Sequence, residues 1–503
     1  MILVSLSSAS ARVNGIQVNG ARAKATPAPA APTQAIQPNA VHDDATRFAK
    51  DAFDAGSFDA TGFDATSFDA VHVDGGDLGA ADLDAVDLDA HRAPLPPRHL
   101  IKITPGVPAD GGYDELAEVF RPVFARIAEG ARERDAGRVL PYEPVAWLNQ
   151  VRFGAVRVPA TDGGYGASLS DTFRLLIELA EADSQVAHLL RSHVGFVESI
   201  LLLEDGAERR RWFDRFVSGQ LVGNAYTERG GNALGRLNTV LRERDGGWLV
   251  SGEKYYCTGT IFADWVAVAA ELPGVAGRHI AVVPTQHSGV RIFDDWDGFG
   301  QQLTGTGSTT FRDVPVDTLL TPSDLVVHPE SAVFQLVLLA VQAGISRAVL
   351  ADARNAVQQR TRAFSTGTGA SPRHDPQVLQ LVGEISASAF TVDAVVLAAV
   401  AELESVIAAP GLTPAEQYAV CELAANRAQA AVQPIVLAAA TKLFDGLGAS
   451  STARGCNLDR HWRNARTVAT HNPAMYKARI VGDYEVNGAA PRKFDAVGDA
   501  AQA

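Results

Sequence analysis

The chain has 503 residues, of which 47% are hydrophobic and 20% charged, and a formal net charge of −14. This length allows a large buried core and more than one domain. The sequence has no basic stripe of the kind that binds nucleic acid, so we expect no nucleic-acid partner.

The acidity is concentrated near the N-terminus. Residues 43–89 contain thirteen Asp against Arg47 and Lys50, which accounts for −11 of the net −14 and leaves −3 for all other residues. In the same stretch an apolar residue recurs every five positions from Phe53 to Leu88, a pattern similar to pentapeptide repeats. So few copies bury little, and acidic, Ala/Gly-rich sequence disfavours independent folding. We therefore expect residues 1–95 to be a disordered, low-complexity extension.

Cysteine usage and hydropathy indicate a cytoplasmic protein. Cys257, Cys421 and Cys456 are too few and too scattered for a disulfide framework or a paired zinc site, so we expect no metal. No apolar run approaches the roughly 20 residues that span a bilayer, so we expect no membrane segment. Met1–Ala11 also lacks the charged start of a signal peptide. The absence of acidic residues from residues 1–42 leaves a transit peptide as the alternative.

Residues 96–220 are predicted to form an N-terminal helical domain. Apolar residues at helical spacing predict helices over Tyr113–Ala136, Ser170–Glu181, His188–Leu203 and Glu208–Val217. Asp162–Gly166 is predicted to be a glycine-rich turn.

The periodicity then changes, which predicts a central β domain over residues 221–330. Short strands are predicted at Leu221–Tyr226, Thr239–Arg244, Gly247–Ser251, Trp265–Ala270, His279–Val283 and Thr309–Phe311. Asp245-Gly246-Gly247 is typical of a hairpin turn. Residues 331–495 return to helices rich in Ala, Leu and Val, as in a packed bundle, at Val333–Ala363, Pro376–Ala408 and Pro414–Gly446.

The segment from Asp459 to Thr467, followed by His471-Asn472-Pro473, is unusually polar. A helix here would place Arg460, Arg463 and Thr467 on one face, which is too polar for an ordinary core and favours a binding site. The alternative is a solvated helix end stopped by Pro473.

This segment resembles the C-terminal signature of flavin monooxygenases built on the acyl-CoA dehydrogenase fold, the group that includes dibenzothiophene monooxygenase and sulfur-acquisition oxidoreductases. The resemblance extends over residues 96–490. It implies a mainly α protein with an N-terminal helical domain, a central β-barrel-like domain and a C-terminal four-helix bundle. Acyl-CoA dehydrogenases carry a Tyr-Glu-Gly turn where this chain has His471-Asn472-Pro473. An amide cannot replace that Glu as a general base.

Two segments of the β domain resemble the family's flavin-binding sequences. Tyr226-Thr227-Glu228 is similar to the Thr-Glu-Pro-Gly segment that meets the flavin pyrimidine, although Arg229 replaces the Pro. Cys257-Thr258-Gly259 is similar to the Cys-(Ser/Thr)-Gly of the monooxygenase branch, whose hydroxyl points at flavin N5. The resemblance thus implies flavin contacts from Tyr226, Thr227, Cys257 and Thr258, and from Asn472 at the C-terminal turn. Each segment taken alone is also compatible with an ordinary strand end.

The expected phosphate site departs from the dehydrogenase pattern. The family's Arg-x-x-Phe-Gly motif grips the FAD pyrophosphate from a neighbouring subunit, whereas this chain reads Arg360-Thr361-Arg362-Ala363-Phe364-Ser365. Arginine binds phosphate through its planar fork, so Arg360 or Arg362 could hold the shorter FMN. We expect FMN, with FAD as the alternative. Both arginines are equally compatible with a helix C-terminus that favours cations.

No Gly-x-Gly-x-x-Gly opens a helix after a strand, so no nicotinamide site is evident. The resemblance then implies a two-component monooxygenase: a separate NAD(P)H-dependent reductase supplies reduced flavin, which with O2 oxygenates a small, organosulfur substrate. His471 is the expected proton donor, with Thr258 near N5 and His193 as a second catalytic histidine. We expect His188, His374 and His461 to be structural. The resemblance also implies a homotetramer.

Two other functions remain open from the sequence. The chain could be a dehydrogenase or oxidase of an acyl thioester with its base on another helix, at Glu384, Glu402 or Glu404. It could also be a non-enzymatic family member whose acidic N-terminal segment is an interaction arm. An apolar pocket formed by Trp462, Tyr226, Phe262 and Trp296 would not distinguish a sulfur centre from carbon or nitrogen.

Overall fold

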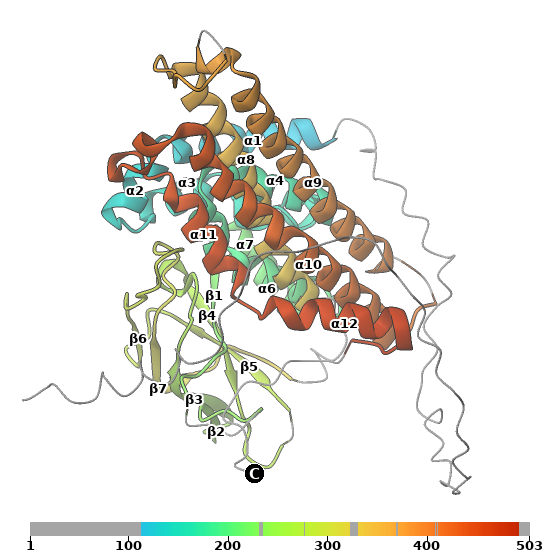
Figure 1. The fold of residues 1–503 in the computed structure, drawn as a ribbon. Coiled ribbons are helices and arrows are strands. Elements are labelled where there is room, and N and C mark those ends of the chain that lie inside the picture. Colours follow the sequence, from blue (N-terminus) through green and yellow to red (C-terminus); the bar gives the residue numbers. More distant parts are fainter. Residues whose placement is uncertain are drawn as a thin grey trace, which may run out of the picture. The chain divides into compact units, whose positions relative to one another are not determined.

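The fold is known from a computed structural model, which describes residues 112–230, 235–275, 277–321, 330–368, 371–407, 409 and 411–491. All of them belong to one compact unit, Asp89–Ala503. The predicted disordered extension, residues 1–95, lies outside the described residues. Helices make up most of the described unit, and its strands gather at one end (Figure 1).

Two of the four helices predicted before the strands are interrupted, while the other two match their predictions to within one residue at each end. The predicted helix Tyr113–Ala136 is two helices separated by Gly130, and the predicted helix His188–Leu203 breaks at Leu190. Ser168 and Asp183 cap the helices that follow them, accepting hydrogen bonds from the backbone N–H groups of Asp171 and Gln185. The seven helices are α1 Gly112–Glu129, α2 Ala131–Gly137, α3 Tyr142–Gln150, α4 Leu169–Ala182, α5 Ser184–Leu189, α6 Arg191–Leu201 and α7 Ala207–Val217.

The described strands form two four-stranded sheets, ordered β1-β4-β5-β8 and β2-β3-β7-β6. An isolated bridge between Val240 and Glu271 joins them, so the expected barrel-like domain is built as two sheets. The hairpin prediction is confirmed: Arg244 pairs with Gly247, and Asp245 and Gly246 both have positive φ, as this turn requires. The strands are β1 Val222–Ala225, β2 Val240–Arg244, β3 Gly247–Lys254, β4 Trp265–Ala270, β5 His279–Pro284, β6 Val290–Ile292, β7 Thr309–Pro315 and β8 Thr318–Leu320.

Three long helices and two shorter ones follow the sheets. The first ends at Gln359 instead of the predicted Ala363, so Arg360 and Arg362 lie beyond it. A capping box between Thr413 and Glu416 starts the third. The five helices are α8 Glu330–Gln359, α9 Pro376–Ile407, α10 Pro414–Leu447, α11 Asp459–Ala469 and α12 Ala474–Asn487.

The core is continuous between the early and late helices. One apolar cluster combines residues of α1 and α4 with residues of α8, α9 and α10, and two smaller clusters fill the faces of the sheets. Because α8 packs on α4 as well as on α9 and α10, it is the central helix of the described unit (Figure 1). The β domain is therefore held against a rigid helical body.

Two of these helices are long and apolar enough to cross a membrane, contrary to the expectation that no segment approaches this length. They are Ser331–Gln359 and Pro414–Leu447, and 78% and 44% of their most apolar windows are buried inside the fold. Buried core helices pass the same test of length and composition.

Candidate active site

The two segments that resemble flavin-binding sequences lie side by side. β1 ends at Ala225 and β3 at Lys254, and the residues that follow them form a bridge in which the Tyr255 N–H donates to the Thr227 carbonyl at 2.8 Å. Tyr256 is 48% exposed and has a φ of 59°. A non-glycine residue rarely adopts this conformation, and such strain collects at functional sites. The geometry thus presents an exposed aromatic ring two residues before Thr258.

A buried chain of hydroxyl groups begins at Thr258. Its Oγ1 lies 2.8 Å from the hydroxyl of Thr306, which lies 2.7 Å from that of Thr304. Thr304 donates to the carbonyl of Gln301 at 2.9 Å, and the side-chain Oε1 of Gln301 lies 3.1 Å from His188 Nδ1. The turn that carries Thr258 is therefore connected, through buried polar groups, to a histidine on α5.

Gly259 brings this turn against the end of α5. Its φ is 79°, and a Cβ at this position would lie 2.2 Å from the carbonyl oxygen of Leu189. Only glycine meets both conditions. The close approach fixes Thr258 relative to α5 and α6.

We expect Gly259→Ala to destabilise the protein by about 3 kcal/mol, because it adds a steric clash to a strained φ. Gly246→Ala is the matched control, since Gly246 has a φ of 77° but no atom within 4 Å of the added Cβ. That variant should lose only about 1 kcal/mol. Thermal unfolding of both variants measures the difference, and equal losses would contradict the role given to the Leu189 contact.

His471 lies in the short connection between α11 and α12. Its N–H donates to the Val468 carbonyl, while the side chain of Asn472 donates to Gln335 Oε1 on α8 and thereby fixes the connection to the bundle. The His471 ring is accessible, yet surrounding protein and then the charge of Arg191 hold its pKa well below its usual value. The ring is therefore neutral near pH 7. A neutral ring keeps one N–H, and the role of His471 as the proton donor stays a prediction.

His188 is a site residue that the sequence did not identify. It is 5% exposed, and its Nε2 has no hydrogen-bond partner among the described residues. Its charge would also affect His471, so the two rings lie in one electrostatic environment together with Arg191. Buried polar atoms are normally satisfied, and an unpartnered one indicates a ligand or water. The sequence signal was present: His188, Arg191 and Ser192 follow helical spacing in an otherwise apolar stretch.

His193 does not fit the catalytic role predicted for it. Its Nε2 lies 2.8 Å from the Gly154 carbonyl oxygen, and its Nδ1 accepts the Val222 N–H at 3.3 Å. The ring also packs edge-on against Phe216. Both ring nitrogens are thus occupied by backbone groups, which leaves none for a flavin or a substrate, and we infer a structural role.

The other predicted cofactor residues have varied surroundings. The Cys257 thiol is buried in the core between the sheets, and this burial raises its pKa to about 12. Cys257 therefore packs the turn against the core. Arg360 donates to the carbonyls of Gly446 and Leu447 at the end of α10, as a helix-capping cation does. Arg362 is exposed. A phosphate contact from Arg360 or Arg362 stays a prediction.

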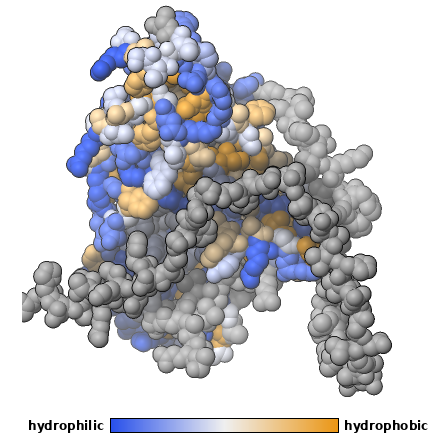
Figure 2. Space-filling model, in the orientation of Figure 1, coloured by the Kyte–Doolittle hydropathy of each residue, from blue (hydrophilic) through white to orange (hydrophobic). Residues whose placement is uncertain are grey.

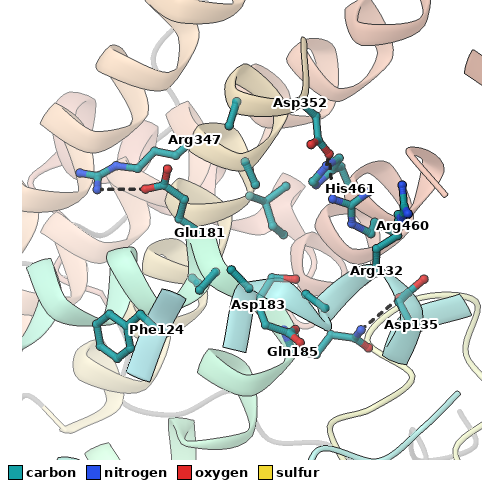
Figure 3. Close-up of a pocket in the computed structure, with 18 of the residues that line it drawn as sticks. Phe124, Arg132, Asp135, Glu181, Asp183, Gln185, Arg347, Asp352, Arg460 and His461 are labelled. Carbon is teal, nitrogen blue, oxygen red and sulfur yellow. Dashed lines mark hydrogen bonds and ion pairs between the residues drawn. The ribbon is translucent and has the colours of Figure 1, made fainter. Parts of the chain in front are cut away.

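The polar face of α11 contacts acidic residues of other helices. Arg460 and His461 both contact Asp352 of α8, and Arg463 contacts Asp135 of α2. These pairs border a cavity of about 670 Å³, whose lining contains none of the residues predicted to be catalytic or to bind the cofactor (Figure 3). The charged groups of this face have protein partners, and Arg460, His461 and Asn464 also line the cavity, so the interpretation of this face as a binding site stays a prediction.

The chain is similar to proteins of known families. Residues 336–475 match the family described as acyl-CoA dehydrogenase, C-terminal domain. The chain is 28% identical over 383 residues to SfnC of Pseudomonas putida, a probable FMNH2-dependent monooxygenase, covering 74% of this chain and 95% of that relative. It is 26% identical over 355 residues to dibenzothiophene monooxygenase of Rhodococcus qingshengii, covering 66% of this chain and 84% of that relative.

Two solved structures extend the similarity to the fold. Methanesulfinate monooxygenase MsuC from Pseudomonas fluorescens has a TM-score of 0.68 and 28% identity, covering 75% of this chain and 97% of that one. TdsC from Paenibacillus sp. A11-2, solved with FMN and indole, has a TM-score of 0.68 and 25% identity, covering 75% and 98%. Over most of its length the chain is similar to FMNH2-dependent monooxygenases with the acyl-CoA dehydrogenase fold. The predicted fold class is thus confirmed as a mostly helical protein with two small sheets.

Two buried histidines lead us to expect that the folded protein loses stability in acid. Burial lowers the pKa of His188 and of His193 to about 4, against an ordinary value of 6.5. The unfolded chain therefore binds more protons between these values, and stability is lost as pH falls from 6.5 towards 4. We expect each histidine to lower the free energy of unfolding by about 2 kcal/mol at pH 5 relative to pH 7.5.

Urea unfolding at several pH values measures this loss. His193→Gln should flatten the dependence between pH 7.5 and 5, since glutamine does not titrate there. An unchanged pH dependence in this variant would contradict the assignment.

Proposed function

We propose that this chain is the oxygenase component of a two-component system that uses FMNH2 and O2 to oxygenate a small organosulfur compound. The observation that carries the proposal is the buried polar chain from Thr258 to His188, which lies in one electrostatic environment with His471. It joins the segment that resembles a flavin-binding turn to two neutral histidines. SfnC is a probable FMNH2-dependent monooxygenase and TdsC was solved with FMN, which supports FMN as the cofactor.

The residues of the site fit a flavin. His188 Nε2 is an unpartnered buried nitrogen, and Tyr256 is an exposed ring held in a strained conformation before Thr258. Reduced FMN supplies the two electrons that, with O2, insert one oxygen atom into the substrate and convert the other to water. We infer that Thr258 and Tyr256 position the isoalloxazine ring. His471, neutral near pH 7, would offer an N–H donor where negative charge develops on oxygen. His188 donates its Nδ1–H to Gln301 Oε1, so its unpartnered Nε2 would offer an acceptor to the flavin or the substrate.

The alternative acyl-thioester chemistry lacks a base beside His471. Glu384 pairs with Lys442, and Glu404 accepts hydrogen bonds from the start of α4. Burial raises the pKa of Glu402, but no described contact places it near the C-terminal turn. A dehydrogenase needs such a base for proton abstraction.

The proposal is tested with the purified chain, FMN, NADH and a flavin reductase, by following oxygen from ¹⁸O₂ into small organosulfur compounds. We expect labelled product only when the reductase is present. Oxidation of an acyl-CoA in air without reductase would instead establish the thioester activity. Failure to bind any flavin would favour the non-enzymatic alternative.

We also propose the three-part domain arrangement, with boundaries near residues 96, 220, 330 and 495, a cytoplasmic location and a homotetramer. Several large apolar side chains of the late helices are exposed, including Phe390 at 77% and Val486 at 82%, which supports association. Apolar residues are also visible among polar ones over the helices in Figure 2. Light scattering after size-exclusion chromatography tests the oligomeric state.

A further inference from the structure

Arg191 has an unusual set of partners for a partly enclosed arginine. It begins α6, and its Nε donates to the Phe334 carbonyl at 3.0 Å while its guanidinium lies 4.9 Å from the Phe334 ring centroid. No carboxylate pairs with it among the residues that the structure describes. Other partly enclosed arginines do have carboxylate partners, as Arg157 does in Glu198 and Arg347 in Asp393. Among the described residues, the Phe334 carbonyl is the acceptor recorded for Arg191, so its other N–H donors can bind a ligand.

The position of this guanidinium is fixed. Phe334 packs so closely on α6 that a Cβ at Gly195 would lie 2.2 Å from its ring. The aromatic face and the carbonyl therefore hold Arg191 from one side only. The same Phe334 ring lies 6.3 Å from the ring of Tyr226, so Arg191 lies beside the segment that resembles a flavin-binding sequence. The charge of Arg191 also lowers the pKa of His471.

The charge of Arg191 is uncompensated. Burial lowers its pKa to about 10, so it stays protonated at neutral pH, while burial keeps His188 neutral there. The positive end of the α6 dipole adds to the positive potential. A partly desolvated cation without a partner is costly, and it favours an anionic ligand.

We propose that Arg191 binds the oxyanion of the substrate, so that the organosulfur substrate of this chain is a small anion such as an alkanesulfinate. This inference rests on the proposed function and names its substrate class. A planar guanidinium donates two parallel hydrogen bonds to two oxygens of one group, which a sulfinate offers and a neutral sulfide or thiophene does not. MsuC, with the same fold, is named for methanesulfinate.

The reaction is balanced with the co-substrates already proposed. An alkanesulfinate, FMNH2 and O2 yield an alkanesulfonate, FMN and water. The sulfur lone pair forms the new S–O bond, the O–O bond breaks, and the flavin gives up two electrons and two protons. Arg191 contacts the sulfinate oxygens and leaves the sulfur lone pair free.

The negative charge could also come from FMN, through its phosphate or its reduced ring. The experiment therefore compares ligands that differ only in charge. Binding of methanesulfinate and of neutral dimethyl sulfoxide is measured by calorimetry on the FMN-loaded protein, and FMN binding is measured separately by fluorescence quenching. The variants are Arg191→Met, Arg191→Lys and the surface control Arg210→Met, whose side chain is 63% exposed and pairs with Asp205.

We expect the unsubstituted protein to bind methanesulfinate and not dimethyl sulfoxide. Arg191→Met should raise the Kd for methanesulfinate by about 10- to 100-fold, as for a lost charge-assisted hydrogen bond, with FMN affinity unchanged. Arg191→Lys should recover part of the loss, and Arg210→Met should change nothing. Arg191→Lys also keeps the test valid if the Met variant does not fold.

Two results would overturn the inference. One is a loss of FMN affinity in Arg191→Lys that equals or exceeds the loss for methanesulfinate, because the anion would then be the cofactor. The other is oxygenation of neutral sulfides without binding of sulfinates, which would leave the proposed function intact. Failure of the unsubstituted protein to oxygenate any substrate would instead defeat the proposed function, and sulfinate binding to Arg191 would still be measurable.

Discussion

His471→Ala should lower the oxygenation rate by about 10²- to 10⁴-fold, the usual contribution of a positioned proton donor. FMN binding should persist, because Thr258 and the turn after β3 lie on other elements. The low pKa of His471 means that the ring acts as a neutral donor at working pH. His471→Gln, which keeps a neutral N–H, should therefore retain more activity than His471→Ala.

His374→Ala is the control for this experiment, since His374 is exposed and its ring nitrogen contacts only the hydroxyl of Ser371. Coupled NADH oxidation and direct product detection must both be followed, because lost oxygen transfer releases peroxide without product. A His471→Ala variant that forms product at the full rate would remove His471 from the mechanism.

Lys254→Met should destabilise the protein by about 3–5 kcal/mol, the cost of removing one partner of a buried ion pair. The Lys254 side chain is fully buried and donates to Glu228 Oε1 at 2.7 Å. Glu228 also accepts the backbone N–H groups of Asn238 and Thr239. Without the lysine, a desolvated carboxylate would remain directly after Thr227.

Lys442→Met is the matched control, because Lys442 pairs with Glu384 where both side chains are about two-fifths exposed. Such surface pairs contribute at most about 1 kcal/mol. Thermal unfolding of Lys254→Met and Lys442→Met compares the buried pair with the surface pair. The coupling within the buried pair is measured from Lys254→Met, Glu228→Gln and the double variant Glu228→Gln/Lys254→Met. The double variant should recover part of the loss, and a purely additive loss would show that the pair is not coupled.

The sequence predicted the elements that depend on periodicity and turn chemistry. The three long helices began close to their predicted starts, and β4 matches its prediction, because long apolar patterns and a hairpin turn are local signals. β6 and β8 were missed because each is only three residues long. β8 also pairs with β5, which is not its neighbour in the chain. The break at Leu190 was missed because apolar residues continue through it.

Site residues were harder to predict, because their roles depend on partners far along the chain. The segments around Thr227 and Thr258 were recognised together, and the structure joins them. The sequence could not separate His193 from His188, since both are buried histidines on neighbouring helices. The ring nitrogens of His193 contact the Gly154 carbonyl and the Val222 N–H, whereas His188 Nε2 has no hydrogen-bond partner among the described residues. No local pattern contains that information.

The contact between α11 and the loop before β7 limits how this protein can be recombined with its relatives. The Gln301 N–H donates to the Asn464 side chain at 2.7 Å, and the same glutamine leads through its side chain to His188. A chimera that exchanges only the C-terminal helices would pair one parent's residue 464 with the other parent's residue 301. Crossovers should therefore keep both positions from one parent, even though 163 residues separate them.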